Sequence, residues 1–133
     1  MSANLDLVRS IYVAWERGDY SRADWADPNI EYVIADGLHP DRCVGLGAMA
    51  KAMRHWLSAW TDLRMEAQEY RELDPGRIMV LHRFGASGKT SGVDVGRIET
   101  EGVGLFHVRD GKVTGIVHYY DRGRAFADLG LEE

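Results

Sequence analysis

Two stretches of the chain repeat apolar residues at the three-and-four spacing of an amphipathic helix. The first covers about residues 3–17, and Gly18 can end it in the left-handed conformation. The second covers residues 46–60. A short helical piece is expected between them, over residues 19–25. The apolar stripe of the first helix consists of Leu5, Val8, Tyr12 and Trp15, and that of the second of Met49, Met53, Trp56 and Trp60.

Later in the chain the apolar pattern changes to the period of two that is typical of strands. A strand is already expected over residues 29–35, followed by a loop over 36–45. Asp121 and Gly130 are typical of the start and end of a last short helix. Helices followed by a run of strands predict an α+β fold, with a curved antiparallel sheet and helices packed on one side. The later strands are expected over residues 63–73, 77–86, 97–108 and 112–121.

The turn at Asp110-Gly111 permits two registers for the last hairpin. A two-residue turn pairs Arg109 with Lys112, whereas a three-residue turn, which we favour, places His118 opposite Gly102. In the favoured register one face holds glycines opposite bulky residues, which leaves volume for a ligand pocket. That face comprises Gly102, Gly104, Phe106, Thr114, Ile116, His118 and Tyr120.

The other face of this hairpin is apolar as well: it carries Val103, Leu105, Val113, Val117 and Tyr119. Exposing it to water would forgo roughly 1.5–3 kcal/mol for each large side chain. Because the helices are expected on one side only, we predict that a second copy covers this face in a homodimer. The alternative is that the C-terminal helix covers it.

Composition excludes several classes of protein. The 133 residues fit a single domain, with 45% hydrophobic residues and a net charge of −5. This acidic balance argues against binding to nucleic acid or to an anionic membrane. The first residues, MSANLDLVRS, lack the layout of a secretion signal, and we expect a cytoplasmic protein. Cys43 is the only cysteine, and no histidine spacing indicates a metal site, so we expect no metal and no cofactor.

Several segments are similar to a known family. IYVAWERGD followed by WADPNIEYV, and the later LFHVRDGKVTGIVHYYDRGRAFADLG, resemble SnoaL-like proteins of the nuclear transport factor two-like superfamily. The resemblance covers residues 1–133 almost completely. It implies a cone-shaped α+β barrel whose sheet and N-terminal helices enclose a cavity, in a protein that is usually dimeric. It implies little about activity, because this fold hosts many chemistries.

The known chemistries of this superfamily can be compared position by position. In the ketosteroid-isomerase branch, Tyr32 stands where the resemblance implies a carboxylate base, and Gly104 stands near the acidic oxyanion donor. The tyrosine of its helix falls near Ile11, one step from Tyr12. In the limonene-epoxide-hydrolase branch, His118 stands at the position of the catalytic aspartate. The machinery of the first branch is therefore absent, and that of the second is incomplete.

His118 is the best candidate for a catalytic group, because imidazole exchanges a proton near neutral pH. His82 is the second candidate, provided that its strand turns that face inward. The alternative for His118 is a buried histidine with a satisfied hydrogen bond, and the alternative for His82 is an outward position. Aromatic and small residues on the same faces are candidate ligand-binding residues, with a core role as the alternative for each. They are Tyr12, Trp15, Tyr32, Trp56, Trp60, Phe84, Gly102, Gly104, Phe106, Ile116 and Tyr120.

These observations predict a cavity protein for a small apolar organic ligand. One hypothesis is an enzyme of the isomerase, cyclase or dehydratase type that uses acid/base chemistry. The alternative is a binding protein of the same fold without catalysis.

Overall fold

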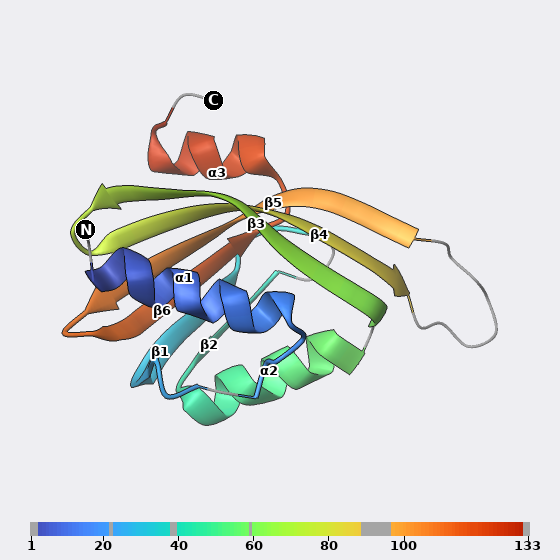
Figure 1. Cartoon of the computed structure of the whole chain (residues 1–133), viewed down its shortest axis with the longest axis horizontal. Helices are drawn as coiled ribbons and strands as arrows, with labels where there is room; N and C mark the ends of the chain where they lie inside the picture. The colour runs from blue at the N-terminus through green and yellow to red at the C-terminus, as the bar shows by residue number, and fades with distance from the viewer. Residues whose placement is uncertain (1–2, 22, 38–39, 59, 89–96, 132–133) are drawn as a thin grey trace.

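The chain folds into three helices and one six-stranded sheet in a computed structural model, which describes residues 3–21, 23–37, 40–58, 60–88 and 97–131 (Figure 1). The helices are α1 (Ala3–Glu16), α2 (Leu46–Ser58) and α3 (Arg122–Leu129). The strands are β1 (Ala26–Ile34), β2 (Asp41–Val44), β3 (Trp60–Asp74), β4 (Arg77–Gly88), β5 (Arg97–Arg109) and β6 (Lys112–Tyr119). No helix in this part of the chain is long and apolar enough to cross a membrane.

The sheet has the order β2-β1-β6-β5-β4-β3 and is curled without closing. All neighbouring pairs are antiparallel except β1 and β6, which run parallel, so the expectation of a wholly antiparallel sheet is wrong at this pair. A parallel pair needs a long crossover, which the chain between β1 and β6 supplies. The predicted α+β class with a curved sheet is confirmed.

Three boundaries differ from the sequence prediction. The expected loop over residues 36–45 contains the edge strand β2, whose side chains are mostly exposed and give no apolar alternation. The described residues between 19 and 25 form turns and no helix. The second helix ends at Ser58, so Trp60 opens β3 instead of closing the apolar stripe of α2. At β2 and at Trp60, pairing with the sheet outweighs a short local pattern.

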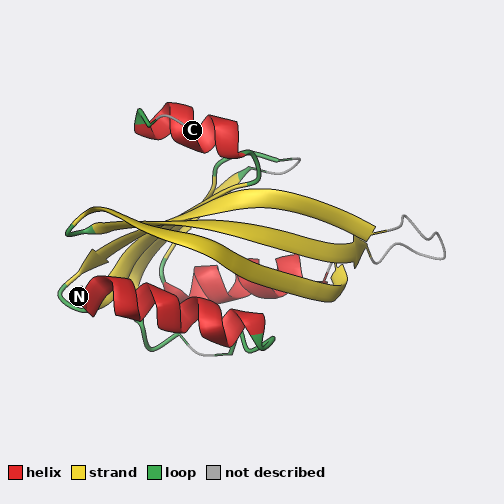
Figure 2. Cartoon of the chain, turned by 45° about the horizontal axis from the view of Figure 1, so that its top comes forward, coloured by secondary structure: helices red, strands yellow, loops and turns green. Residues whose placement is uncertain are grey.

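The helices cover both faces of the sheet, so the prediction that they pack on one side is wrong (Figure 2). Helices α1 and α2 lie on the inner face, where the larger core contains Val8, Tyr12, Ile30, Phe84 and Phe106. Helix α3 lies on the outer face, where Ala125 and Phe126 complete a second core. The strand residues of this second core include Met79, Leu81, Val103, Leu105 and Tyr119.

Helix α3 begins and ends where the sequence indicates. The Asp121 carboxylate accepts a hydrogen bond from the backbone N–H of Gly123 at 2.9 Å. Gly130 adopts a φ of 68°, and its N–H closes the last turn. Because α3 buries Val103, Leu105 and Tyr119 within one chain, these residues do not need a second copy to cover them. The homodimer stays a prediction.

The last hairpin begins in the two-residue register and not in the three-residue register that we favour from the sequence. Arg109 pairs with Lys112 across a two-residue turn, in which both Asp110 (φ 52°) and Gly111 (φ 76°) are left-handed. A β-bulge at Thr114 then shifts the pairing, so His118 lies opposite Gly104. The bulge reverses which side chains face inward before it. Val113 therefore joins the inner core, and Thr114 lies on the outer face beside His107, the reverse of the prediction for both.

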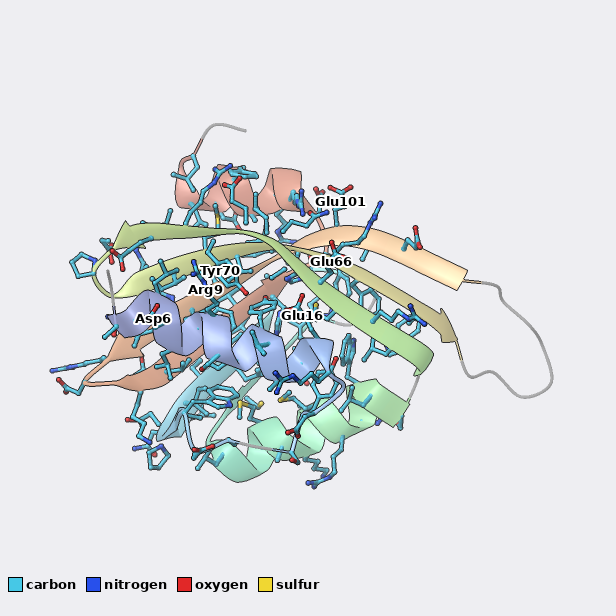
Figure 3. All side chains as sticks on the ribbon, viewed as in Figure 1. Asp6, Arg9, Glu16, Glu66, Tyr70 and Glu101 are labelled. Carbon is cyan, nitrogen blue, oxygen red and sulfur yellow. The ribbon has the colours of Figure 1, made fainter. Side chains whose placement is uncertain are left out.

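Helix α1 is held on β3 by charged groups at its surface (Figure 3). The Arg9 guanidinium lies 5.0 Å from the centre of the Tyr70 ring. At the last residue of the helix, the Glu16 carboxylate accepts a hydrogen bond from the backbone N–H of Ala67 at 3.3 Å. These contacts fix the helix that carries Tyr12 and Trp15 over the inner face.

Candidate active site

A pocket opens between α1, α2 and the inner face of the sheet. Its cavity volume is about 40 Å³, which has room for roughly three water molecules. None of its lining side chains belongs to Asp, Glu, Lys or Arg. The lining consists of Trp15, Tyr20, Tyr32, Ile34, Met53, Trp56, Met65, His82, Phe84, Thr100, Gly102, His118, Tyr119 and Tyr120.

His82 on β4 is held by a tyrosine behind the pocket wall. The Tyr12 hydroxyl lies 2.9 Å from His82 Nδ1, and both residues are buried. Tyr12 has no other side-chain hydrogen bond among the described residues, so we assign its hydroxyl as the donor and Nδ1 as the acceptor. A neutral imidazole carries a single N–H. The proton of His82 is therefore on Nε2, which has no partner in the described part of the chain.

The two glycines of β5 make room for this pair. A Cβ at Gly104 would lie 2.5 Å from the Tyr12 hydroxyl oxygen. A Cβ at Gly102 would lie 2.8 Å from His82 Nε2 and 2.5 Å from the carbonyl oxygen of Tyr119. The sequence predicts empty volume at both glycines, but the space at Gly104 is filled by Tyr12. Only Gly102 lines the pocket.

Arg122, the first residue of α3, fixes the backbone of the same two strands from the outer side. Its guanidinium donates to the carbonyl oxygens of His82 at 3.1 Å and Gly102 at 3.3 Å. It also pairs with the Glu101 carboxylate at 2.9 Å and bonds to the Gln68 side chain. His82 is thus anchored through its ring by α1 and through its backbone by α3.

His118 on β6 meets the same pocket with a free ring. The centre of its ring lies 5.5 Å from that of Tyr32, 6.2 Å from Trp15 and 6.3 Å from His82. Among the described residues, the ring makes no hydrogen bond. Its nitrogens are therefore available to a molecule in the pocket.

Both histidines are uncharged at neutral pH. Burial, together with the smaller effects of the neighbouring His118 and Arg122, lowers the pKa of His82 to about 3. Burial lowers the pKa of His118 to about 4. Burial also raises the pKa of Tyr12 well above its ordinary value, so the hydroxyl keeps its proton. The site therefore presents a neutral N–H donor on His82 and a neutral ring on His118.

A hydrogen bond closes the pocket on the side of α2. The Trp56 indole N–H donates to the Tyr120 hydroxyl at 2.9 Å, and both side chains are half-buried. Tyr120 is positioned by the buried Asp36 carboxylate, which accepts from the backbone N–H groups of Tyr120 at 2.6 Å and Asp121 at 3.2 Å. Gly37, with a φ of 93°, passes so close to the Tyr120 ring that a Cβ would lie 2.7 Å away.

The structure brings most of the sequence-predicted site residues to this pocket. His118, His82, Trp15, Tyr32, Trp56, Phe84, Gly102 and Tyr120 line it. Five others lie outside the lining: Tyr12, Trp60, Gly104, Phe106 and Ile116. Tyr12 acts on the pocket through His82, and Trp60 packs edge-on against Phe84 at 5.4 Å between ring centres.

Six lining residues are not among the sequence-predicted ones: Tyr20, Ile34, Met53, Met65, Thr100 and Tyr119. Ile34 and Met53 lie on the apolar faces of β1 and α2, so their apolar spacing could have identified them as lining residues. Tyr20 lies in a segment without periodicity, between α1 and β1, and no pattern points to it.

No group of three or more residues that could ligate a metal occurs in the described ranges. His82 and His118 share the pocket, but no third His, Cys, Asp or Glu joins them in its lining. The chemistry of the site is therefore considered from these two rings and the tyrosine hydroxyls.

Residues 8–116 match the family described as the SnoaL-like domain. The chain belongs to this family. The match includes His82, and His118 lies two residues beyond its end. Among curated proteins, none matches this sequence.

Solved structures share the fold of this SnoaL-like domain. An NTF2-like protein of unknown function from Burkholderia pseudomallei K96243 is 19% identical, with a TM-score of 0.78 over 96% of this chain and 97% of that one. A proposed polyketide cyclase from Xanthomonas campestris pv. campestris is also 19% identical, with a TM-score of 0.71 over 96% of both chains. A proposed SnoaL-like polyketide cyclase from Jannaschia sp. CCS1 is 13% identical, with a TM-score of 0.74 over 98% and 94%. At these identities the likeness shows the fold alone.

Proposed function

We propose that the protein is a small cavity enzyme that binds an uncharged organic molecule and moves a proton on it. One observation carries the proposal: two neutral imidazoles from different strands meet one pocket, each with a ring nitrogen that no described residue occupies. Acid/base chemistry needs a donor and an acceptor within reach of the same substrate. His82 Nε2–H is the donor, and a ring nitrogen of His118 is the acceptor.

An uncharged substrate follows from the lining of the pocket. A charged ligand would leave water for a site in which no side chain is ionised, and this carries a large desolvation cost. The aromatic wall formed by Trp15, Tyr32, Trp56 and Phe84 favours a flat, apolar body. A cavity of about 40 Å³ is too small for such a molecule, so binding requires wall side chains to move. Met53 and Met65 are unbranched and well suited to this adjustment.

The reaction supported by this arrangement begins at a carbon next to a carbonyl group. His118 takes a proton from that carbon, the electron pair of the C–H bond forms a carbon–carbon double bond, and the π electron pair of the carbonyl group moves onto its oxygen. The resulting enolate oxygen accepts the hydrogen bond from His82 Nε2–H, which is available before the reaction starts. The imidazolium of His118 then returns its proton to another atom of the substrate, as in an isomerisation, or to the leaving group of a dehydration.

The low pKa of His118 limits which protons can move. A base with a pKa of about 4 removes a carbon-bound proton readily only when a second group activates it. The substrate class is therefore a carbonyl compound whose acidic carbon is also flanked by an aromatic ring or a second carbonyl.

Deuterium exchange into 2-indanone tests the proposal, because each of its acidic carbons lies between a carbonyl and an aromatic ring. Proton NMR in heavy water is expected to show faster exchange with the protein, and about 100-fold less acceleration with His118→Gln. His55→Gln is the matched control, since His55 is exposed on α2. Quenching of tryptophan fluorescence measures binding separately.

The same experiment separates the second candidate function, a binding protein without catalysis. The small cavity and the weak basicity of His118 favour this alternative. It predicts quenching by 2-indanone with no acceleration of exchange in the wild-type protein. Absence of both quenching and exchange would contradict both candidates for this class of ligand.

A further inference from the structure

The hydroxyl group of Tyr20 is buried in the pocket region without a hydrogen-bond partner. Tyr20 lines the pocket from the segment between α1 and β1, whereas the two histidines line it from β4 and β6. Its oxygen is out of reach of water, from the pocket as well as from bulk solvent, and the described part of the chain offers it no partner. A ligand therefore reaches this hydroxyl only when side chains of the pocket wall move. Buried hydroxyl groups in proteins are almost always hydrogen-bonded, so an unpaired one needs a physical reason.

The position of the ring connects Tyr20 to the catalytic candidates. Tyr20 stacks on Trp15 with ring centres 6.0 Å apart and an interplanar angle of 21°. Trp15 in turn contacts His118, with ring centres 6.2 Å apart. The Trp15 indole therefore contacts both Tyr20 and His118, and all three residues line the same pocket.

A second unpaired buried group serves as a contrast. The Trp60 indole N–H also lacks a partner among the described residues, but Trp60 does not line the pocket. Tyr20 has an unpaired buried polar group and also lines the pocket. Burial raises the pKa of Tyr20 to about 12, so the hydroxyl remains a donor throughout the neutral range.

We infer that Tyr20 is a ligand-binding residue whose hydroxyl donates a hydrogen bond to an acceptor oxygen at the far end of the ligand. The near end is the oxygen that meets His82 and His118, so this inference rests on the proposed function. The ligand is then a flat, uncharged molecule with polar oxygens at two separated positions, the one at Tyr20 being an ether or carbonyl oxygen. A wholly hydrocarbon far end would leave the buried hydroxyl unpaired, which disfavours such ligands.

Two phenols that differ by one group test the inference. 4-Methoxyphenol carries an acceptor oxygen where 4-ethylphenol carries a methylene group, and both are uncharged at pH 7. The ratio of their dissociation constants, measured by tryptophan fluorescence, is compared between the wild-type protein and Tyr20→Phe. We expect the preference for 4-methoxyphenol to fall by about fivefold in the variant, the effect of one hydrogen bond. Differences in hydrophobicity between the probes cancel in this comparison.

Tyr70→Phe is the matched control, because Tyr70 on β3 is half-buried and does not line the pocket. Its preference ratio is expected to equal that of the wild-type protein. Thermal unfolding gives a second readout. Since Tyr20→Phe removes an unpaired buried donor, its midpoint is expected to stay the same or rise.

An unchanged preference ratio in Tyr20→Phe would overturn the inference, and so would a fall of several degrees in its unfolding midpoint, which would show a structural role for the hydroxyl. Exchange of 2-indanone in the same variant keeps the two proposals distinct. If exchange persists while the ratio does not change, only the inference about Tyr20 fails. If neither phenol binds the wild-type protein and exchange is absent, the proposed function fails, and the inference with it.

Discussion

At the scale of single residues, the site depends on side chains that are missing as much as on those that are present. Gly104 leaves the space that the Tyr12 hydroxyl occupies, and Gly102 leaves room for the His82 ring. The hydroxyl then selects the tautomer of His82 that turns an N–H toward the pocket. Two glycines on β5 and a tyrosine on α1 therefore determine the chemistry of a histidine on β4.

The substitution Gly104→Ala tests this dependence. A Cβ would lie 2.5 Å from the Tyr12 oxygen and 3.2 Å from the Phe106 ring, so both must shift. We expect the free energy of unfolding in urea to fall by about 1–3 kcal/mol. Gly47→Ala is the control: Gly47 is exposed on α2 with nothing near its Cβ position, and the change is expected to stabilise the helix by about 0.5–1 kcal/mol. Equal stability of Gly104→Ala and wild type would contradict the packing described.

The substitution Tyr12→Phe tests the assigned tautomer. Nitrogen-15 NMR of the wild-type protein at pH 7 is expected to show His82 with Nε2 protonated and Nδ1 bare. Without the Tyr12 hydroxyl, Nδ1 loses its donor, the tautomers mix, and unfolding becomes easier by about 1–3 kcal/mol. The same spectrum in Tyr70→Phe should match wild type. A wild-type spectrum with the proton on Nδ1 would contradict the assignment.

Sequence patterns located the two histidines and most of the aromatic wall beside them, but not Tyr20 or the contact that holds His82. Alternation along β4 and β6 places His82 and His118 on faces shared with apolar residues, and burial of those faces turns both rings inward. Tyr20 has no such signal, because its segment follows neither helix nor strand period. The role of Tyr12 could not be predicted either, since its contact with His82 joins residues 70 positions apart.

At the scale of elements, helix α3 buries apolar residues on the outer face of the sheet. Its start and end could be predicted from Asp121 and Gly130, because local hydrogen bonds define both. From the sequence, its position on the outer face is the alternative to a homodimer, because its eight residues carry only two large apolar side chains, Phe126 and Leu129. In the structure the helix both covers the outer face and, through Arg122, anchors the strands that form the pocket.

The substitution Phe126→Ala measures this contribution. Phe126 is 5% exposed, packs into the outer core and carries the Arg71 guanidinium 5.6 Å from its ring centre. We expect a loss of about 3 kcal/mol in the free energy of unfolding by urea. Arg124→Ala, an exposed position on the same helix, should change this value by less than about 0.5 kcal/mol. A loss below about 1 kcal/mol for Phe126→Ala would show that α3 contributes little to the fold.

At the scale of the whole molecule, the two pocket histidines make stability depend on pH. In the unfolded chain a histidine takes up a proton near pH 6.5, whereas folded His118 and His82 do so only near pH 4 and 3. The unfolded state therefore binds more protons between these values. The stabilisation is complete above pH 6.5 and is lost as the pH falls, by up to about 1.4 kcal/mol per pH unit for each histidine.

Urea unfolding at a series of pH values checks this prediction. Between pH 6 and pH 4.5 the free energy of unfolding of the wild-type protein should fall more steeply than that of His118→Gln, by roughly the slope of one histidine. The carboxylates titrate in the same way in both proteins, so their contribution to the free energy of unfolding cancels when the two proteins are compared at equal pH. Parallel curves for the two proteins would contradict the neutral state of His118.

The homodimer is also a prediction at this scale. Helix α3 covers much of the outer face, and the part beyond it contains Val33, His107 and Val117, which line a shallow groove. A partner would have to cover this remaining strip. Sedimentation of the protein at micromolar concentration is expected to show a dimer, and a monomer would contradict the prediction.

The β-bulge at Thr114 has a consequence for how this chain tolerates insertions and deletions. Loss of one residue from a strand normally turns every following side chain to the opposite face. Here Val113 and Ile116 both face inward with two residues between them, so loss of Thr114 leaves Gly115 alone between them and restores regular alternation. His118 would keep its place opposite Gly104. A shortened hairpin that retains the pocket is therefore accessible to this sequence in a single step.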